Sequence, residues 1–146
     1  MKALLLLFLW PWWACAQSSR ELVAAVLIAE AGGEGTNGLS AVAEVIRRRV
    51  ELGEPSPASV VKRKGQFSVL NGVSPRSLWQ RTVPHPLYLE AWRLAGVLYE
   101  RPDSLPRQTQ DADHFCHKGA RPYWSKGHRP SLTIGNHDFY RLRRSP

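Results

Sequence analysis

Apolar residues form an almost continuous run near the start of the chain. Ser18 and Glu21 have the spacing of a capping box, and they lead into Leu22 to Ala31, which is rich in strong helix formers. Gly32-Gly33 follows and ends the predicted helix directly after Glu30. The pattern therefore predicts an almost wholly apolar helix with one carboxyl group at its carboxyl end.

Three more helices are predicted before residue 102. The first covers Thr36 to Val50, where apolar residues recur at helical spacing and charged residues take the other positions, so that it packs by one face. A short helix is expected from Pro57 to Lys62, followed by a turn at Gly65 to Ser68 and a brief extended piece. Pro86 occupies the tolerated first turn of a third long helix, which ends before Pro102.

The last third of the chain changes from helical to extended patterning. Ala112 to His117 and Thr133 to Arg141 are rich in aromatic or β-branched residues, and the loop between them carries several glycines and prolines. Two strands joined by a long loop are therefore expected. The chain as a whole is predicted to be an α+β fold, mostly helical with a small antiparallel sheet near the C-terminus.

Length and composition place this pattern in one globular domain. The chain has 146 residues, of which 43% are hydrophobic and 22% charged, and this composition excludes wholesale disorder. Its formal net charge of +8 favours an anionic partner such as nucleic acid, teichoic acid or membrane lipid. The cations form only short clusters, so we interpret them as solvated surface and expect no nucleic-acid partner.

The N-terminus has the organisation of a secretory signal peptide. Met1-Lys2 supplies a positive end, Ala3 to Trp10 is wholly apolar, and Ala14-Cys15-Ala16 offers small residues for cleavage. Residues 1–16 are therefore predicted to be the signal peptide, and residues 17–146 the exported domain. Its expected location is the periplasm, or the cell wall and the space outside the cell.

Two alternatives to removal of this segment stay open, namely a retained membrane anchor and lipidation at Cys15. Pro11 interrupts an apolar run that is already short for the ~30 Å hydrocarbon core of a bilayer. If cleavage precedes Gln17, Cys116 is the only cysteine left, so we expect a packed free thiol and no intramolecular disulfide. The exported domain is expected to be a monomer without a stable membrane span.

Glu30 is the strongest candidate for a catalytic group on local chemistry. It follows the apolar run, and both burial and the negative end of the helix dipole disfavour its charged form. A carboxyl group that stays protonated near neutral pH can act as the general acid in cleavage of a glycosidic bond. Its position alone is also compatible with pairing to an arginine or with exposure to solvent.

Several short motifs follow one another along the chain in a specific order. They are Ala29 to Gly35, the helix from Gly38 to Val50, Gly65 to Ser68, Ala112 to Phe115 with Pro122 to Trp124, and Thr133 to Tyr140. In this order and spacing the chain resembles the SleB-type cell wall hydrolase family, the spore-cortex-lytic enzymes and their relatives. The resemblance implies a lysozyme-like fold, similar to that of lytic transglycosylases, with Glu30 as the catalytic acid.

The resemblance also implies how peptidoglycan is cut. Glu30 would donate its proton to the oxygen between N-acetylmuramic acid and N-acetylglucosamine, and then remove the proton of the muramic acid 6-hydroxyl. That hydroxyl closes on the anomeric carbon and gives a 1,6-anhydro product, so one carboxyl group suffices and no cofactor is expected. The alternative is lysozyme-type hydrolysis, for which Glu34 is the nearest second carboxyl group in the sequence.

A set of substrate-binding residues is expected around Glu30. They are Glu34, Gln66, Ser68, Trp124, His137 and Tyr140, of which Trp124 and Tyr140 resemble positions of the family's cleft region. Glu34 is also compatible with a loop charge or a local structural contact. His137 is equally compatible with a structural role. Phe67, Phe115 and Phe139 are expected in the core, and Asp138 is expected to be a charge on the strand surface.

Two positions depart from the family. Gly32 stands where relatives commonly have arginine, and Arg48 stands where they usually have asparagine. The missing guanidinium group at position 32 is expected to change the pKa of Glu30 or the binding of substrate.

A non-catalytic peptidoglycan-binding module is the main alternative from another class of protein. It would keep the cationic surface and the aromatic residues, and Glu30 would be dispensable. A metal site is not expected, because the histidines and the cysteine of the last third lack the short pair spacing of zinc sites. Peptidoglycan glycan strands are the expected partner of either an enzyme or a binding module.

Overall fold

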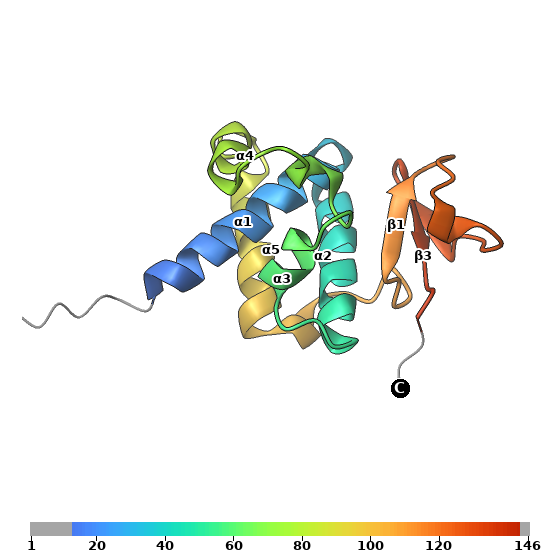
Figure 1. The fold of residues 1–146 in the computed structure, drawn as a ribbon. Helices are drawn as coiled ribbons and strands as arrows, with labels where there is room; N and C mark the ends of the chain where they lie inside the picture. The colour runs from blue at the N-terminus through green and yellow to red at the C-terminus, as the bar shows by residue number, and fades with distance from the viewer. Residues whose placement is uncertain (1–12, 144–146) are drawn as a thin grey trace, which may run out of the picture.

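The computed structural model describes residues 13–143, with side chains from residue 19 onward. Within these residues the α-helices form a bundle on one side of the molecule, and a three-stranded sheet lies on the other side, beside α2 (Figure 1). The helices are α1 (Trp13–Ala31), α2 (Gly35–Glu51), α3 (Pro57–Lys62), α4 (Pro75–Thr82) and α5 (Tyr88–Glu100). The predicted α+β fold, mostly helical with a small antiparallel sheet near the C-terminus, is confirmed.

α1 is the central helix of the bundle. It packs against α2, α3, α4 and α5, and its run from Leu22 to Ile28 is buried without interruption. A helix enclosed by others has no polar face, and this explains the continuous apolar sequence. Each large aliphatic side chain buried there contributes roughly 1.5–3 kcal/mol of transfer free energy. The expected end at Gly32-Gly33 is confirmed, since α1 ends at Ala31.

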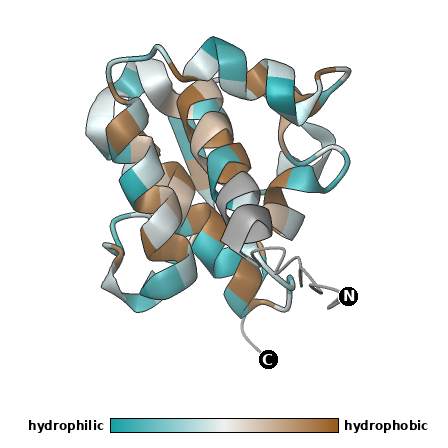
Figure 2. Cartoon of the chain, turned by 90° about the vertical axis from the view of Figure 1, so that its left-hand side faces the viewer, coloured by the Kyte–Doolittle hydropathy of each residue, from teal (hydrophilic) through white to brown (hydrophobic). Residues whose placement is uncertain are grey.

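α2 lies between the bundle and the sheet and is buried on both sides. Leu39 and Ile46 belong to the main core with α1 and α5, whereas Ala41 and Val45 pack with Phe139 of the sheet. The expectation that this helix packs by one face is wrong, because the sheet covers its second face. On the side of the molecule away from the sheet, hydrophilic and hydrophobic segments alternate along the helices (Figure 2).

The sheet consists of β1 (His114–His117), β2 (Leu132–Ile134) and β3 (His137–Tyr140), in the antiparallel order β1-β3-β2. The expectation of a single strand from Thr133 to Arg141 is therefore wrong, because these residues form a hairpin of two strands. Ile134 pairs with His137, and the two-residue turn between them has glycine first, at a φ of 57°. Glycine at this position favours a tight hairpin turn over a continued strand.

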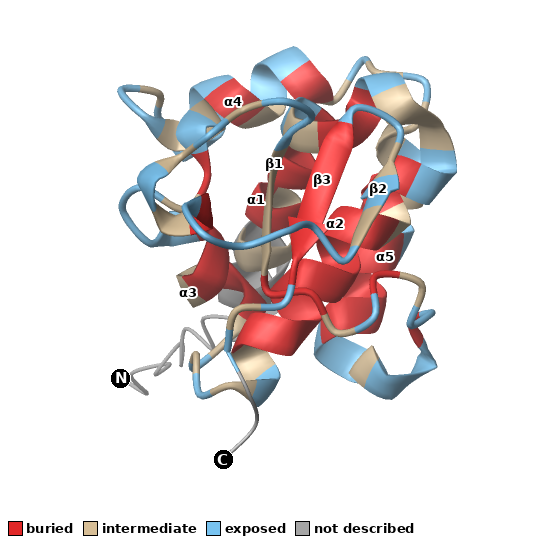
Figure 3. Ribbon diagram, turned by 90° about the vertical axis from the view of Figure 1, so that its right-hand side faces the viewer, coloured by how far each residue is buried: buried red, intermediate tan, exposed pale blue. Residues whose placement is uncertain are grey.

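β3 is buried on both of its faces. Phe139 faces α2, while Tyr140 packs against Trp124 of the loop that follows β1. Figure 3 shows this exposed loop crossing the outer face of the sheet in front of the buried strand. Asp138 is buried beneath it and accepts a hydrogen bond from the Thr133 hydroxyl at 2.6 Å. The expectation of a surface charge at Asp138 is wrong, because the loop covers that face.

The start of α1 also differs from the expectation. The helix begins at Trp13, so Ser18 lies inside it and does not cap it. The preceding residues include Ala14, Ala16 and Gln17, which have high helix propensity, and nothing there stops the helix. Most of the predicted signal peptide, residues 1–12, lies outside the described residues. In the part of the chain that the structure describes, no helix is long and apolar enough to cross a membrane.

The remaining helices show where local signals suffice. α3 has the predicted bounds, and α5 begins at Tyr88, close to the expected start at Pro86. The sequence pattern does not predict α4, although Ser74 caps this helix by accepting a hydrogen bond from the backbone of Ser77 at 3.1 Å. Its eight residues bury little apolar surface, so hydrophobic periodicity does not mark it.

The expectation of a brief extended segment after the turn at Gly65 to Ser68 is also wrong. Ser68–Leu70 forms a 3-10 helix instead. Backbone hydrogen bonds close it, from Leu70 to Phe67 at 3.3 Å and from Asn71 to Ser68 at 2.9 Å.

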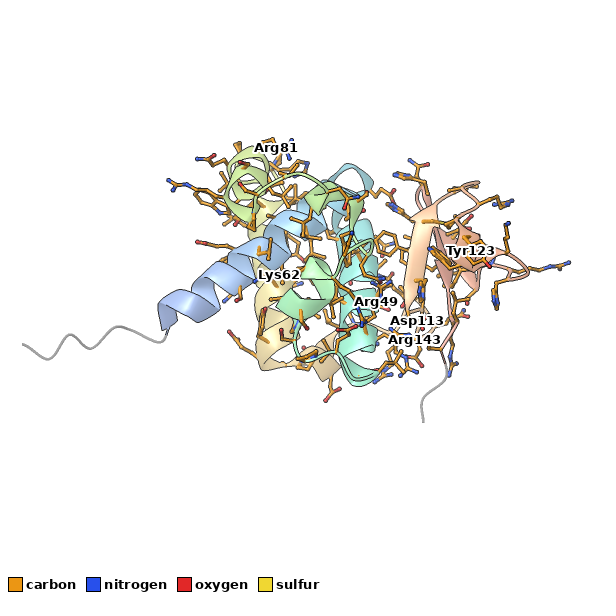
Figure 4. The ribbon with its side chains drawn as sticks, viewed as in Figure 1. Arg49, Lys62, Arg81, Asp113, Tyr123 and Arg143 are labelled. Carbon is orange, nitrogen blue, oxygen red and sulfur yellow. The ribbon has the colours of Figure 1, made fainter. Side chains whose placement is uncertain are left out.

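Buried polar contacts connect α2 to the residue just before β1, and connect that residue to the chain that follows β3. Nε of Arg49 donates to the backbone carbonyl of Asp113 at 2.7 Å. The Asp113 carboxylate accepts hydrogen bonds from the backbone N–H groups of Leu142 and Arg143, at 2.8 and 2.9 Å. Figure 4 shows Arg49, Asp113 and Arg143 together between α2 and the sheet. Burial alone would raise the pKa of Asp113, but hydrogen bonds from His114 and these N–H groups hold it well below its usual range.

We predict that Asp113→Asn lowers the free energy of unfolding at pH 7 by about 1–3 kcal/mol, because buried N–H donors lose a charged acceptor. The pKa of Asp113 in the folded protein lies below its unfolded value of about 3.9, so its contribution is present above about pH 4 and is lost as the pH falls further. Urea unfolding at pH 7 and at pH 3 measures both effects.

The matched control is Asp103→Asn, at an exposed position in a 3-10 helix. It should leave the stability at pH 7 nearly unchanged. Equal stability of the Asp113 variant and the wild type at pH 7 would contradict the importance of this contact.

Candidate active site

A pocket of about 420 Å³ opens between the carboxyl end of α1 and the sheet. The end of α1, the segment from Gly65 to Asn71 and β1 with the loop after it contribute its walls. The lining residues are Glu30, Gly65, Gln66, Ser68, Asn71, Phe115, Cys116, His117, Ala120, Pro122, Trp124 and His137. Of the site residues proposed from the sequence, all but Glu34 and Tyr140 are among them.

Glu30 enters the pocket from the last turn of α1. Burial raises the pKa of its carboxyl group, while the backbone of Val69 and the charge of His117 act in the opposite direction, and the net pKa is raised. Oε1 of Glu30 is buried and has no hydrogen-bond partner among the described residues. A buried oxygen without a donor favours the neutral acid, which is the form that can give a proton.

Glu34 points away from the pocket, toward the β2–β3 turn. Its Oε1 lies 2.8 Å from Nδ1 of His137, and only 10% of its side chain is exposed. Its carboxylate lies against Gly135, where a Cβ atom would collide with Oε2. On the other side, a Cβ atom at Gly38 would lie 2.6 Å from the Cβ of Glu34. Two glycines therefore make room for this one side chain.

His137 connects Glu34 to the pocket. Its ring is buried, stacks on the ring of His117 with centroids 4.7 Å apart, and meets the ring of Phe115 edge-on at 5.2 Å. His117 in turn acts electrostatically on Glu30. Contacts thus run from Glu34 through His137 to His117, and the link from His117 to Glu30 is electrostatic.

The segment after α3 presents polar groups to the pocket because its central residue is held in the core. Phe67 is buried and packs against Phe115 with ring centroids 6.0 Å apart. Its neighbours Gln66 and Ser68 consequently face the pocket, and Asn71 joins them from the end of the 3-10 helix. The expectation that Phe67 belongs to the core is confirmed.

Trp124 forms an aromatic wall on the sheet side. It is held between His114 and Tyr140, with ring centroids 5.0 and 5.2 Å away. Tyr140 is buried behind Trp124 and does not line the pocket. Through this ring contact Tyr140 supports the position of Trp124 in the pocket wall.

Some lining residues were not identified from the sequence. Asn71, Cys116 and His117 belong to no motif that points to substrate binding, although alternation along β1 places His117 on the same face as Phe115. Phe115 was expected only in the core, and it packs there while also lining the pocket. Cys116 is a half-buried free thiol.

Gly32 and Arg48, the two positions where the chain departs from the family it resembles, lie in different surroundings. A Cβ atom at Gly32 would lie 3.1 Å from Nε2 of His85, so this imidazole takes up space beside the end of α1. Arg48 is buried and donates to Glu51 at 3.1 Å, outside the pocket. Among the described residues, no three His, Cys, Asp or Glu side chains are arranged to hold a metal ion.

A comparison with known protein families gives a match. The family model described as Cell Wall Hydrolase matches residues 33–140, which is most of the chain. The match begins three residues after Glu30, and it includes Glu34 and all the pocket-lining residues except Glu30. Searches of curated proteins and of solved structures find no match.

The Glu34 carboxylate occupies the space that a side chain at Gly135 would need. Gly135→Ala should destabilise the protein because alanine is strained at a positive φ, by about 1–2 kcal/mol, and because its Cβ atom displaces the Glu34 carboxylate from His137. Moving the Glu34 carboxylate away from His137 should add to this loss of stability. Urea unfolding measures the total.

Gly127→Ala is the matched control for backbone strain. Its φ is 79°, and a Cβ atom there has nothing within 4 Å. Equal destabilisation by the two substitutions would show that the Glu34 contact contributes nothing.

Proposed function

Because the chain belongs to the cell wall hydrolase family, we propose that it is a lytic transglycosylase that cuts peptidoglycan with Glu30 as general acid and then base. Membership of the family indicates an enzyme that acts on peptidoglycan in the cell wall. The bond cut in this proposal joins N-acetylmuramic acid to N-acetylglucosamine.

One observation carries the proposal. Of the described residues that line the pocket, Glu30 is the only one with a carboxyl group, and burial raises its pKa. A reaction that needs one group to serve first as acid and then as base fits this arrangement. Gln66, Ser68 and Trp124 supply the polar and aromatic surfaces expected of a sugar-binding pocket.

The reaction proceeds in two proton transfers. Glu30 protonates the glycosidic oxygen, the bond from this oxygen to the anomeric carbon breaks, and positive charge builds on the muramic acid ring. The Glu30 carboxylate then removes the proton of the 6-hydroxyl group, whose oxygen bonds to the anomeric carbon. The product is a 1,6-anhydro sugar, and Glu30 regains its proton.

Ordinary hydrolysis would require a second carboxyl group about 5 to 9.5 Å from the first, on the other side of the bond. Glu34 is the nearest candidate in sequence, but it contacts His137 and does not line the pocket. This supports a different role for Glu34, as a positioning residue that holds the His137 ring. His137 and His117 then shape the wall opposite Glu30.

We predict that Glu30→Gln abolishes release of soluble fragments from purified peptidoglycan while folding and wall binding persist, because the amide cannot donate the required proton. Mass spectrometry of the fragments released by the wild type should show anhydro-muropeptides. Glu100→Gln, the same change at the exposed end of α5, is the control and should retain activity.

Two outcomes would overturn this proposal. Reducing-end products from the wild type would indicate hydrolysis and would restore Glu34 as a candidate second carboxyl group. No release by the wild type, with wall binding intact, would leave a binding module.

The pH dependence provides a separate prediction. Burial raises the pKa of Glu30 and the charge of His117 lowers it, so His117→Gln should raise this pKa further. Since the protonated acid starts the reaction, activity falls as the pH rises through this pKa, and the alkaline limb of the profile should move to higher pH. His128→Gln, at an exposed position outside the pocket, should leave the limb in place. An unchanged limb in the His117 variant would contradict the electrostatic link.

A further inference from the structure

The loop between β1 and β2, residues 118–131, carries charge of one sign. From His114 to His137 the sequence contains four Lys or Arg residues and no Asp or Glu. The cations are Lys118, Arg121, Lys126 and Arg129, and all four are exposed. We call this segment the cationic loop.

Several arginines elsewhere on the surface are paired with carboxylates. Arg93 pairs with Glu90 at 2.7 Å, and Arg107 pairs with Asp111 at 3.1 Å. Within the described part of the chain, no cation of the loop forms an ion pair. Asp138 is the acidic side chain buried beneath the loop, where it accepts hydrogen bonds from Thr133 and Gly119, so one carboxylate faces four exposed cations and most of the positive charge of the loop is uncompensated.

The cationic loop is held in an ordered shape despite its exposure. Tyr123–Ser125 forms a 3-10 helix, Ser125 is buried, and the ring of Trp124 is held between His114 and Tyr140. A backbone hydrogen bond from Ser131 to Phe139, at 2.7 Å, attaches the end of the loop to β3. Cations carried on an ordered backbone lose less conformational entropy on binding an anion than cations on a mobile segment would.

The same loop forms one wall of the candidate active site. Ala120, Pro122 and Trp124 line the pocket, whereas the four cations do not. Tyr123, between two of the lining residues, has 85% of its surface exposed and projects from the sheet side of the molecule (Figure 4). Nζ of Lys126 lies 5.2 Å from the centre of its ring. The positive charge thus lies on the part of the surface that borders the pocket.

We propose that the cationic loop binds the carboxylates of the peptides attached to N-acetylmuramic acid, so that the enzyme prefers peptide-bearing glycan strands to bare ones. This inference rests on the proposed function. In peptidoglycan the peptide is attached to the sugar whose glycosidic bond would lie at Glu30. A sugar bound in the pocket therefore carries its anionic peptide past the rim, where uncompensated cations attract it.

The test uses the full chain with two triple variants of equal charge. Lys118→Gln, Lys126→Gln and Arg129→Gln neutralise the loop. Arg121 is kept because its Nη1 donates to the carbonyl of Ala120, which lines the pocket. The control variant carries Lys62→Gln, Arg76→Gln and Arg101→Gln, at exposed positions that do not line this pocket. Thermal unfolding confirms that both variants fold.

The substrates are soluble glycan strands with their peptides and the same strands after an amidase has removed the peptides. Exposed ion pairs are individually weak, so three together should raise KM for peptide-bearing strands by about 5- to 20-fold in the loop variant. The control variant should change KM less than about two-fold, and neither variant should change KM for bare strands. High salt should reduce the preference of the wild type.

Binding by the Glu30→Gln variant, with and without the loop substitutions, separates this proposal from the proposed function. If the wild type cleaves both substrates with the same KM, the loop proposal fails while the transglycosylase proposal stands. If nothing is cleaved but Glu30→Gln binds peptide-bearing strands more tightly only when the loop is intact, the loop proposal stands alone. Loss of binding to purified teichoic acid in the loop variant, with peptide-bearing strands unaffected, would assign the loop to phosphodiester polymers and overturn the proposal.

Discussion

The enclosure of α1 by the other helices determines where the proposed acid lies. Its apolar run from Leu22 to Ile28 is buried throughout, so sliding or rotation of the helix would expose apolar surface to water. The last turn is therefore held at the pocket, and Glu30 with it. The same enclosure removes water from the carboxyl group without supplying a donor to Oε1, and for that reason the packing that stabilises the bundle also raises the pKa of Glu30.

The second wall of the pocket depends on α2. Three strands of three or four residues are marginal as an independent sheet, and here they gain stability from the second face of α2 through Ala41 and Val45. Two polar attachments add to this packing: Arg49 holds the chain at Asp113, and Glu34 contacts His137. The packing of the sheet against α2 therefore sets the distance between Glu30 and the rings of His117 and His137.

Chemistry and charge occupy different parts of the proposed site. Within the pocket there is one carboxyl group, Glu30, with two stacked histidine rings and Trp124 on the opposite wall. The four exposed cations of the loop that contributes this wall do not line the pocket. In a peptidoglycan-cleaving enzyme, this division keeps cations away from the acid, where they would lower its pKa, and leaves them free to attract an anionic polymer.

Local patterning determined the main helices and the candidate acid, because an apolar run stopped by Gly32-Gly33 is a property of neighbouring residues. The motif resemblance identified the family, and the sequence indicated five of the twelve described residues that line the pocket, namely Glu30, Gln66, Ser68, Trp124 and His137. Only the tertiary structure decided that α2 is buried on two faces, that Asp138 is covered, and that Glu34 contacts His137 outside the pocket. The contacts of α2 and of Glu34 with the sheet join segments about a hundred residues apart in sequence, and Asp138 is covered by a loop that folds back over its own strand. Local propensity carries no information about which other surface covers a given face.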